Sequence, residues 1–169
     1  SVGLPRGLSL AADVGVPNDA SGLGITVAAS AGAGLGLLGV TALVARTDVT
    51  GEDAVLSGGA MASLRLIGGP LVPFFATLQG GVGRWQAAGT SIEGGEITTT
   101  SVPVGLGLGW TIASPVVSLK PWLAPRMQWT RRTEEGGFGG ETESTDAAVS
   151  GGIDLGFING ITVRGMYDR

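Results

Sequence analysis

The chain contains no cysteine and no histidine among its 169 residues. It therefore has no disulfide, no thiolate nucleophile, no imidazole base and none of the usual zinc ligands. Charge is scarce as well, because only 14% of the residues are charged and the net charge is −4. Without a basic stripe to meet phosphates, nucleic acid is not expected as a partner. Carboxylates are the only metal ligands left, and we expect no cofactor, no metal site and no enzymatic activity.

Glycine and apolar residues are abundant instead. The chain has 32 glycines, 43% hydrophobic residues and a mean hydropathy of +0.36. The glycines follow no collagen period and lie in no polar low-complexity tract, which excludes collagen and disorder. This length predicts one domain over residues 1–169, and this composition is too apolar for an ordinary soluble sheet protein. No charged leader precedes Ser1, so we expect a mature form or one that lacks its signal.

The most informative pattern is the run from Val102 to Trp110, in which glycine takes every second position from Gly105 to Gly109. One face of such a strand is large and apolar, and the other has almost no side chains. A soluble sheet would place polar residues opposite its apolar face. The run therefore predicts a strand with its apolar face toward lipid and its small residues inward.

The same period of two recurs in nine segments, which predict nine strands. The segments are 7–16, 23–33, 37–47, 54–66, 71–83, 98–112, 116–131, 147–157 and 161–169. Short turn signals at 34–36, 68–70, 114–115 and Asn159-Gly160 alternate with longer polar connections at 17–22, 48–53, 84–97 and 132–146. This alternation predicts an all-β fold, an antiparallel up-and-down meander closed into a small transmembrane β-barrel of about 8 to 10 strands.

Transmembrane helices and soluble β architectures are the structural alternatives. Two uncharged runs, from Asp19 to Arg46 and from Glu96 to Lys120, are long enough to cross a bilayer as helices. The residues in them nevertheless alternate with period two, and each run divides into two strands around a turn. Strands are therefore favoured.

The run Thr100–Trp110, followed by a turn and Pro121-Trp122-Leu123-Ala124-Pro125-Arg126, resembles the strand, turn and strand of small bacterial outer-membrane barrels of the OmpA/OmpX-like type. The likeness in motif covers about residues 98–128, and the other segments match in pattern only. The resemblance implies a bacterial outer-membrane location, with outer-membrane lipid and lipopolysaccharide as partners, short turns in the periplasm and long loops outside. It says little about activity.

One departure from that group concerns the strand count. Single-chain bacterial barrels usually have an even number of strands. Nine strands would leave the two ends of the chain on opposite sides, and Asp168-Arg169 lacks the terminal aromatic strand that the resemblance implies. We therefore expect a domain without its last C-terminal strand.

The parity of a residue, meaning whether its position in a strand is odd or even, decides its face, and it assigns a set of charged residues to the inner face. They are Asp13, Arg65, Lys120, Arg126, Asp154, Arg164 and Asp168. Because an unpaired charge in a narrow interior is costly, we expect an ionic network that plugs the lumen, with Asp154 as the partner of several cations. The alternative is a selectivity ring in a narrow channel.

Aromatic residues near the predicted strand ends should form belts at the membrane interfaces. They are Trp85, Trp110, Trp129 and Tyr167, whereas parity places Trp122 inward. Acidic residues gather in two loops: Glu134, Glu135, Glu141, Glu143 and Asp146 in one, Glu93 and Glu96 in the other. We interpret these residues either as solvated residues at the loop tips or as ligands for cations that bridge lipopolysaccharide. The acidic loops are also where we expect a protein partner to bind. Glycines around Phe138 fit a flexible tip or a protruding β-ribbon.

Three functions follow from these features. The first is an integral outer-membrane β-barrel with a structural or interaction role, its loops outside and its lumen plugged. The second is a narrow pore or conduit for small or hydrophobic solutes. The third is a soluble lipocalin-like binder, which requires an apolar interior and a polar exterior, the reverse of the parity found here.

Overall fold

The computed structural model describes residues 7–15, 23–49, 54–69, 72–88, 96–135, 140–157 and 162–168, which form one antiparallel sheet. Its strands are β1 (Gly7–Gly15), β2 (Leu23–Leu35), β3 (Leu38–Val49), β4 (Val55–Gly69), β5 (Val72–Ala88), β6 (Glu96–Trp110), β7 (Ile112–Ala113), β8 (Val117–Glu135), β9 (Glu141–Phe157) and β10 (Thr162–Asp168). Neighbours in the sheet follow chain order, except that the short β7 continues the line of β6 and pairs with β8 alone. The predicted all-β antiparallel meander is confirmed.

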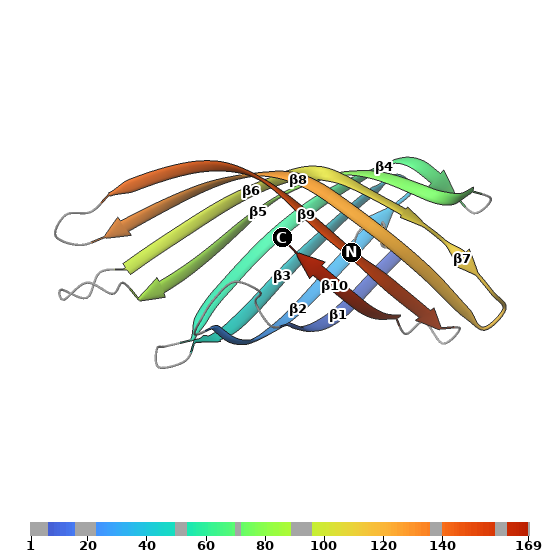
Figure 1. Cartoon of the computed structure of the whole chain (residues 1–169), viewed down its shortest axis with the longest axis horizontal. Coiled ribbons are helices and arrows are strands. Elements are labelled where there is room, and N and C mark those ends of the chain that lie inside the picture. The colour runs from blue at the N-terminus through green and yellow to red at the C-terminus, as the bar shows by residue number, and fades with distance from the viewer. Residues whose placement is uncertain are drawn as a thin grey trace.

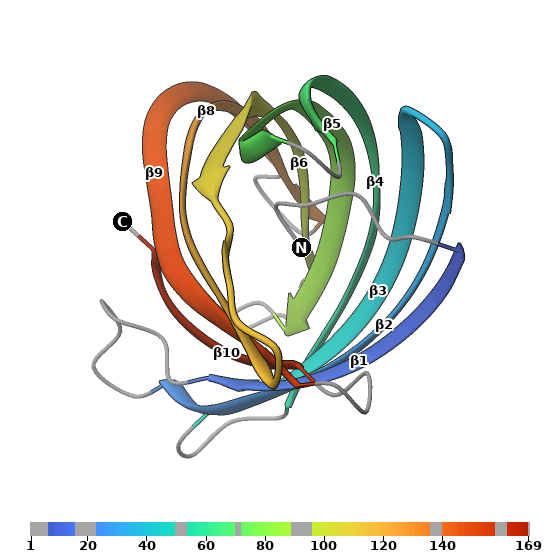
Figure 2. The same cartoon turned by 90° about the vertical axis from the view of Figure 1, so that its right-hand side faces the viewer.

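The meander curls into a half-barrel (Figures 1 and 2). Its edges are β1 and β10, and these two strands do not pair with each other in the described part of the chain. The closed barrel that the sequence predicts is therefore not formed by these strands. Along an antiparallel path with an odd number of strands, the first and last run the same way, so β1 and β10 cannot form an antiparallel pair.

Two of the predicted turns are confirmed. Leu35 pairs with Leu38, and Gly36 between them has a φ of +60°, a conformation that glycine adopts without steric cost. At the second turn, the backbone N–H of Ser114 donates to the carbonyl oxygen of Val117 at 2.9 Å. The Asn159-Gly160 turn lies outside the described residues.

The strands are longer than predicted on the side of the long connections. β5 continues to Ala88, and β8 and β9 stay paired as far as Thr133 and Glu141. The predicted loops 84–97 and 132–146 were therefore too long. Cross-strand contacts support the extra pairing, since Arg131 donates to a carboxylate oxygen of Glu141 at 2.7 Å. β8 and β9 thus extend the half-barrel as a β-ribbon, although residues 136–139 lie outside the described residues.

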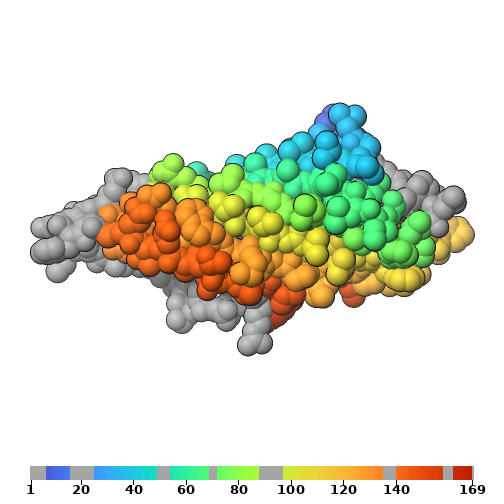
Figure 3. All heavy atoms as spheres, turned by 90° about the horizontal axis from the view of Figure 1, so that it is seen from above, coloured from blue at the N-terminus to red at the C-terminus, as the bar shows by residue number. Residues whose placement is uncertain are grey.

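The two faces of the sheet differ in burial. On one face Thr77 and Thr99 are almost fully buried, and we call this the inner face; the outer face carries apolar side chains such as Leu106 and Leu108, each 42% exposed. Neighbouring strands form a continuous outer surface from the blue and cyan N-terminal strands to the orange β9 (Figure 3). Trp122 is the only buried hydrophobic side chain among the described residues, so the half-barrel has no conventional apolar core there. No helix in the described residues is long and apolar enough to cross a membrane.

Glycines on the inner face leave room for aromatic rings from adjacent strands. Phe75 lies directly opposite Gly109, and Trp122 lies directly opposite Gly152. A Cβ atom at Gly109 would overlap the Phe75 ring, and one at Gly152 would lie 2.9 Å from the Trp122 ring. The hollow face predicted from the glycine alternation therefore accommodates rings from the neighbouring strands.

Replacing Gly105 with alanine should destabilise the sheet by about 1–3 kcal/mol, because the added Cβ would overlap the carbonyl oxygen of Pro125 and lie 2.9 Å from the Cα of Arg126. These are backbone positions that cannot turn aside. Gly80→Ala is the matched control, since its nearest neighbour would be a methyl group of Val104 at an ordinary 3.8 Å. Urea unfolding in detergent should separate the two variants, and equal stability would contradict this packing.

Candidate functional site

A polar cluster on the inner face centres on Asp154 of β9. Arg164 of β10 donates from Nε and Nη2 to the two carboxylate oxygens of Asp154, each at 2.7 Å. The indole Nε1–H of Trp122 donates to the same carboxylate at 3.0 Å, and the Arg164 guanidinium lies 5.6 Å from the centre of the Trp122 ring. The side chains of Asp154 and Arg164 are only 14% and 21% exposed. This is a half-buried, bidentate ion pair backed by an aromatic ring.

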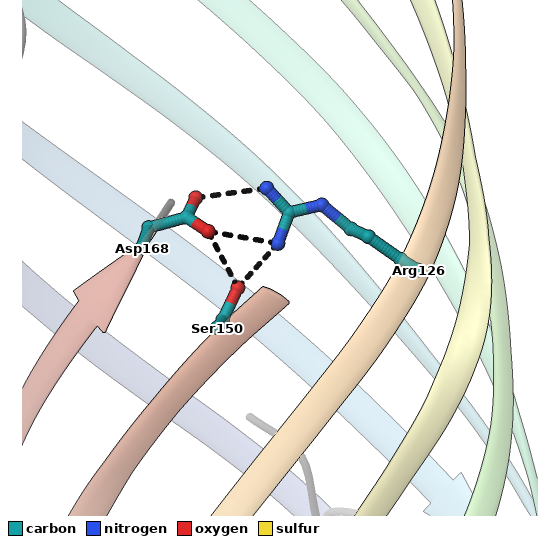
Figure 4. A network of polar contacts seen from close by, with 3 residues as sticks. All are labelled: Arg126, Ser150 and Asp168. Carbon is teal, nitrogen blue, oxygen red and sulfur yellow. Dashed lines mark hydrogen bonds and ion pairs between the residues drawn. The ribbon is translucent and has the colours of Figure 1, made fainter. Parts of the chain in front are cut away.

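A second cluster joins Arg126, Ser150 and Asp168 (Figure 4). Arg126 donates through both terminal nitrogens to the Asp168 carboxylate at 2.9 Å, and Ser150 donates to Asp168 at 2.8 Å. Arg126 also donates to the Ser150 hydroxyl. The guanidinium reaches from β8 across β9 to β10, as expected for side chains on the concave side of a curled sheet. Both clusters therefore lie on the wall formed by β8, β9 and β10.

Strand register explains why these residues meet. Asp154 lies directly opposite Arg164 in the β9–β10 pair, and Asp168 lies directly opposite Ser150. The sequence analysis assigned Asp154, Arg164, Arg126 and Asp168 to one face, and the structure brings them together as two pairs. It did not assign a role to Ser150, although parity placed this residue on the inner face. The donor role of the Trp122 indole was also missed, because it depends on the register of β8 against β9.

Three other residues predicted for the ionic network, Asp13, Arg65 and Lys120, have no ion-pair partner among the residues that the structure describes. Lys120 lies directly opposite Asp154 in the β8–β9 register, but the carboxylate is held by Arg164. Asp154 is therefore shared by one cation and one indole, in place of the several cations expected.

Two of the predicted interface aromatics mark the ends of the apolar outer surface. Trp110 packs beside Phe74 at the short-turn end, with ring centres 5.9 Å apart. Trp129 lies directly opposite Val102 near the other end, and the next outward residue on its strand is the exposed Arg131. Both positions suit amphipathic rings at a boundary between apolar and polar surroundings.

The other two aromatics lie elsewhere. Trp85 is directly opposite Ser57 and Thr99, and Thr99 is 4% exposed on the inner face, so the expectation that Trp85 joins an outer belt was wrong. Trp85 was expected in the belt because it lies near the end of a predicted strand. Its odd position in β5, like that of Thr77, places it on the inner face. Tyr167 points outward and is 59% exposed. It lies opposite Gly151, and Gly151 lies opposite Leu123, so Tyr167 is level with the apolar outer surface and does not mark its end.

The acidic residues of the β8–β9 ribbon have local partners. Glu134 accepts from Arg132 at 2.7 Å, Glu141 accepts from Arg131, and Asp146 accepts from the Ser144 hydroxyl. No group of three or more potential metal ligands comes together in the described residues. Glu93 lies outside those residues. These contacts are typical of a solvated surface, where single ion pairs contribute little to stability.

The inner face therefore has one charged wall, made by β8 to β10, and one wall rich in small and hydroxyl residues, made by β2 to β6. Thr26 and Thr47 share a hydrogen bond of 2.8 Å, and the Thr77 hydroxyl donates to the carbonyl oxygen of Gly107 at 3.3 Å. Such a surface can hold water and pair ions.

An all-strand half-barrel with an apolar outside and an ionic inner wall defines the class of this protein as barrel-like. No family model, no curated protein and no solved structure matches the chain.

Proposed function

We propose that the chain is an integral bacterial outer-membrane β-barrel with a structural or interaction role, without catalytic activity. The observation that carries this proposal is the reversed polarity of the sheet. Large apolar side chains such as Val104, Leu106 and Leu108 lie exposed on the outer face, whereas bidentate ion pairs lie half-buried on the inner face. Lipid is the solvent in which such an outer face is favourable.

The height of the apolar outer surface supports a bilayer location. From Trp110 to Val102, the position opposite Trp129, the strand rises about 27 Å at roughly 3.4 Å per residue. At a strand tilt of about 40°, this corresponds to roughly 20 Å, close to the apolar band of about 25 Å in outer-membrane barrels. Beyond Trp129 the outward residues turn polar, beginning with Arg131. The β8–β9 ribbon would then stand outside the membrane and offer its surface to lipopolysaccharide or a protein partner.

The small OmpA/OmpX-like barrels are the family to which we assign this chain in the proposal. The support is the meander of consecutive antiparallel strands, the short turn at Gly36 and the strand pair β6–β8, which carries the motif of residues 98–128. The two inner clusters, Asp154 with Arg164 and Arg126 with Asp168, would act as the plug. Short turns would face the periplasm.

Lipid quenching of tryptophan tests this proposal. In single-tryptophan variants reconstituted with brominated lipids, Trp110 and Trp129 should be quenched strongly, whereas Trp122 and Trp85 should not, because their rings lie on the inner face. The inner tryptophans serve as internal controls for non-specific quenching. Equal quenching of all four would contradict the assignment of faces, and no quenching of Trp110 would contradict a lipid-facing outer surface.

A narrow pore is the second candidate, and one observation favours it. Arg65 and Lys120 lie on the inner face without an ion-pair partner in the described part of the chain, as cations lining a selectivity ring would. A plugged barrel should show no steady open conductance in planar bilayers. A pore should conduct, with a preference for anions.

A further inference from the structure

The two free edges of the half-barrel differ from every other strand. All nine residues of β1 are exposed, and its outward side chains Leu8, Leu10 and Val14 are 75–90% exposed, compared with 42% for Leu106 in the middle of the sheet. At the other edge β10 has one unpaired side as well. Backbone N–H and C=O groups along both edges therefore lack partners within the described strands. Such unpaired groups are unfavourable in lipid, and this point, like the shared membrane orientation of two copies considered below, rests on the proposed function.

The two edges face each other across a seam. β10 lies beside β1 in both views of the fold, so the two edges are near one another (Figures 1 and 2). The edges also run in the same direction, as the antiparallel order of the sheet requires. A direct pair would be parallel, which is less stable per residue and interrupts an otherwise antiparallel sheet. One strand between them could pair antiparallel with both.

A second copy of the chain does not solve this geometry. Two copies that span a membrane in the same orientation are related by an axis along the barrel, which keeps every strand direction unchanged. β1 of one copy would then meet β10 of the other in a parallel pair, the same mismatch as before. A single peptide strand has no such restriction.

The geometry points to a strand-acceptor site: the seam between β1 and β10 binds one peptide strand, antiparallel to both edges. Its length is set by β1 and β10, at about seven to nine residues. Its outward side chains lie between Leu10 and Val163 and are apolar. Its inward side chains are small or polar, and one of them donates a hydrogen bond to Asp13, which has no ion-pair partner among the described residues.

Disulfide trapping distinguishes this site from direct closure. The chain has no cysteine, so paired substitutions are unambiguous. Direct parallel closure with Asp13 beside Arg164 would place Ala12 near Val163 and Val14 near Gly165, and adjacent strands lie within disulfide reach. A strand in the seam would separate the edges by roughly 10 Å, beyond that reach. The control pair is Ala12→Cys with Ala29→Cys, which are directly opposite in β1 and β2.

We expect the two seam pairs to give a roughly tenfold lower disulfide yield than the control pair in detergent micelles. A yield equal to that of the control would overturn the proposal in favour of direct closure. Because this comparison needs no lipid, its failure is separate from a failure of the proposed membrane location.

Peptide addition tests occupancy of the seam. The probe is a synthetic peptide with the sequence of β2, Leu23–Leu35, which already pairs antiparallel with β1 in the fold. It should slow amide hydrogen exchange at both β1 and β10 and raise the unfolding temperature of the chain. A peptide of the same composition, shuffled to remove the alternation, is the control. Protection of one edge alone, of neither edge, or equal protection by the shuffled peptide would each overturn the inference.

Discussion

Replacement of Asp154 by asparagine should lower the free energy of unfolding by about 3–5 kcal/mol, the loss typical of a buried ion pair from which one partner is removed. The carboxylate is 14% exposed and holds Arg164 at two points and the Trp122 indole at a third. Asparagine keeps the shape of the side chain but leaves the guanidinium without a counter-charge. Urea unfolding in detergent, followed by tryptophan fluorescence, measures the change.

The surface pair of Arg46 and Asp48 supplies the control for this experiment. Both side chains are about two-thirds exposed and lie 3.4 Å apart, so Asp48→Asn should cost less than about 1 kcal/mol. The double replacement Asp154→Leu with Arg164→Met should recover most of the lost stability, since an apolar pair leaves no charge uncompensated. If the single Asp154 variant is as stable as the parent, the cluster does not stabilise the inner wall. If the cluster plugs the barrel, this variant should also conduct ions better than the parent.

Replacement of Leu106 by arginine should cost about 2–4 kcal/mol in a bilayer, the value for a cation at the midplane on the lipid face of a barrel. Leu106 lies outward on β6, midway between Val102 and Trp110, so it occupies the centre of the apolar outer surface. The expected result is a lower yield of folded protein in lipid vesicles. The yield is measured as the fraction of the chain that resists unfolding by detergent without heating.

Thr98→Arg is the matched control, because Thr98 is outward on the same strand but lies beyond the apolar surface, opposite Gln86 and Thr133. Close to the interface the same charge costs only about 0–1 kcal/mol. A folding yield that is equally low for both variants would point to general disruption of β6. Equal yields at the level of the parent would exclude a lipid-facing outer surface at Leu106.

Much of the fold could be predicted from the sequence because the pattern of a strand is local. The side chains of a strand alternate between faces, so glycine at Gly105 and Gly109 opposite leucine at Leu106 and Leu108 identifies both a strand and its two faces without reference to any partner. The nine predicted segments correspond to the nine strands of the main path. Boundaries were less accurate at the long connections, where polar residues that suggested loops are paired in the β8–β9 ribbon.

Parity also predicted much of the candidate site, but it could not predict contacts. It placed Trp122, Asp154 and Arg164 on one face, and the structure joins them. It could not tell that Arg164 would take Asp154 while Lys120, equally close in register, would not. That outcome depends on which side chain can align two donors with the carboxylate, and the planar fork of arginine does this where a lysine ammonium cannot.

The sequence by itself determined the strands, their two faces and the apolar outside, because each of these follows from the alternation of neighbouring residues. Only the tertiary structure decided the register, and register determines which charges meet and why Ser150 joins Arg126 and Asp168. The structure also decided that β1 and β10 are left as unpaired edges. The physical reason is that register and closure depend on residues far apart in the chain, whose relative position no local pattern specifies.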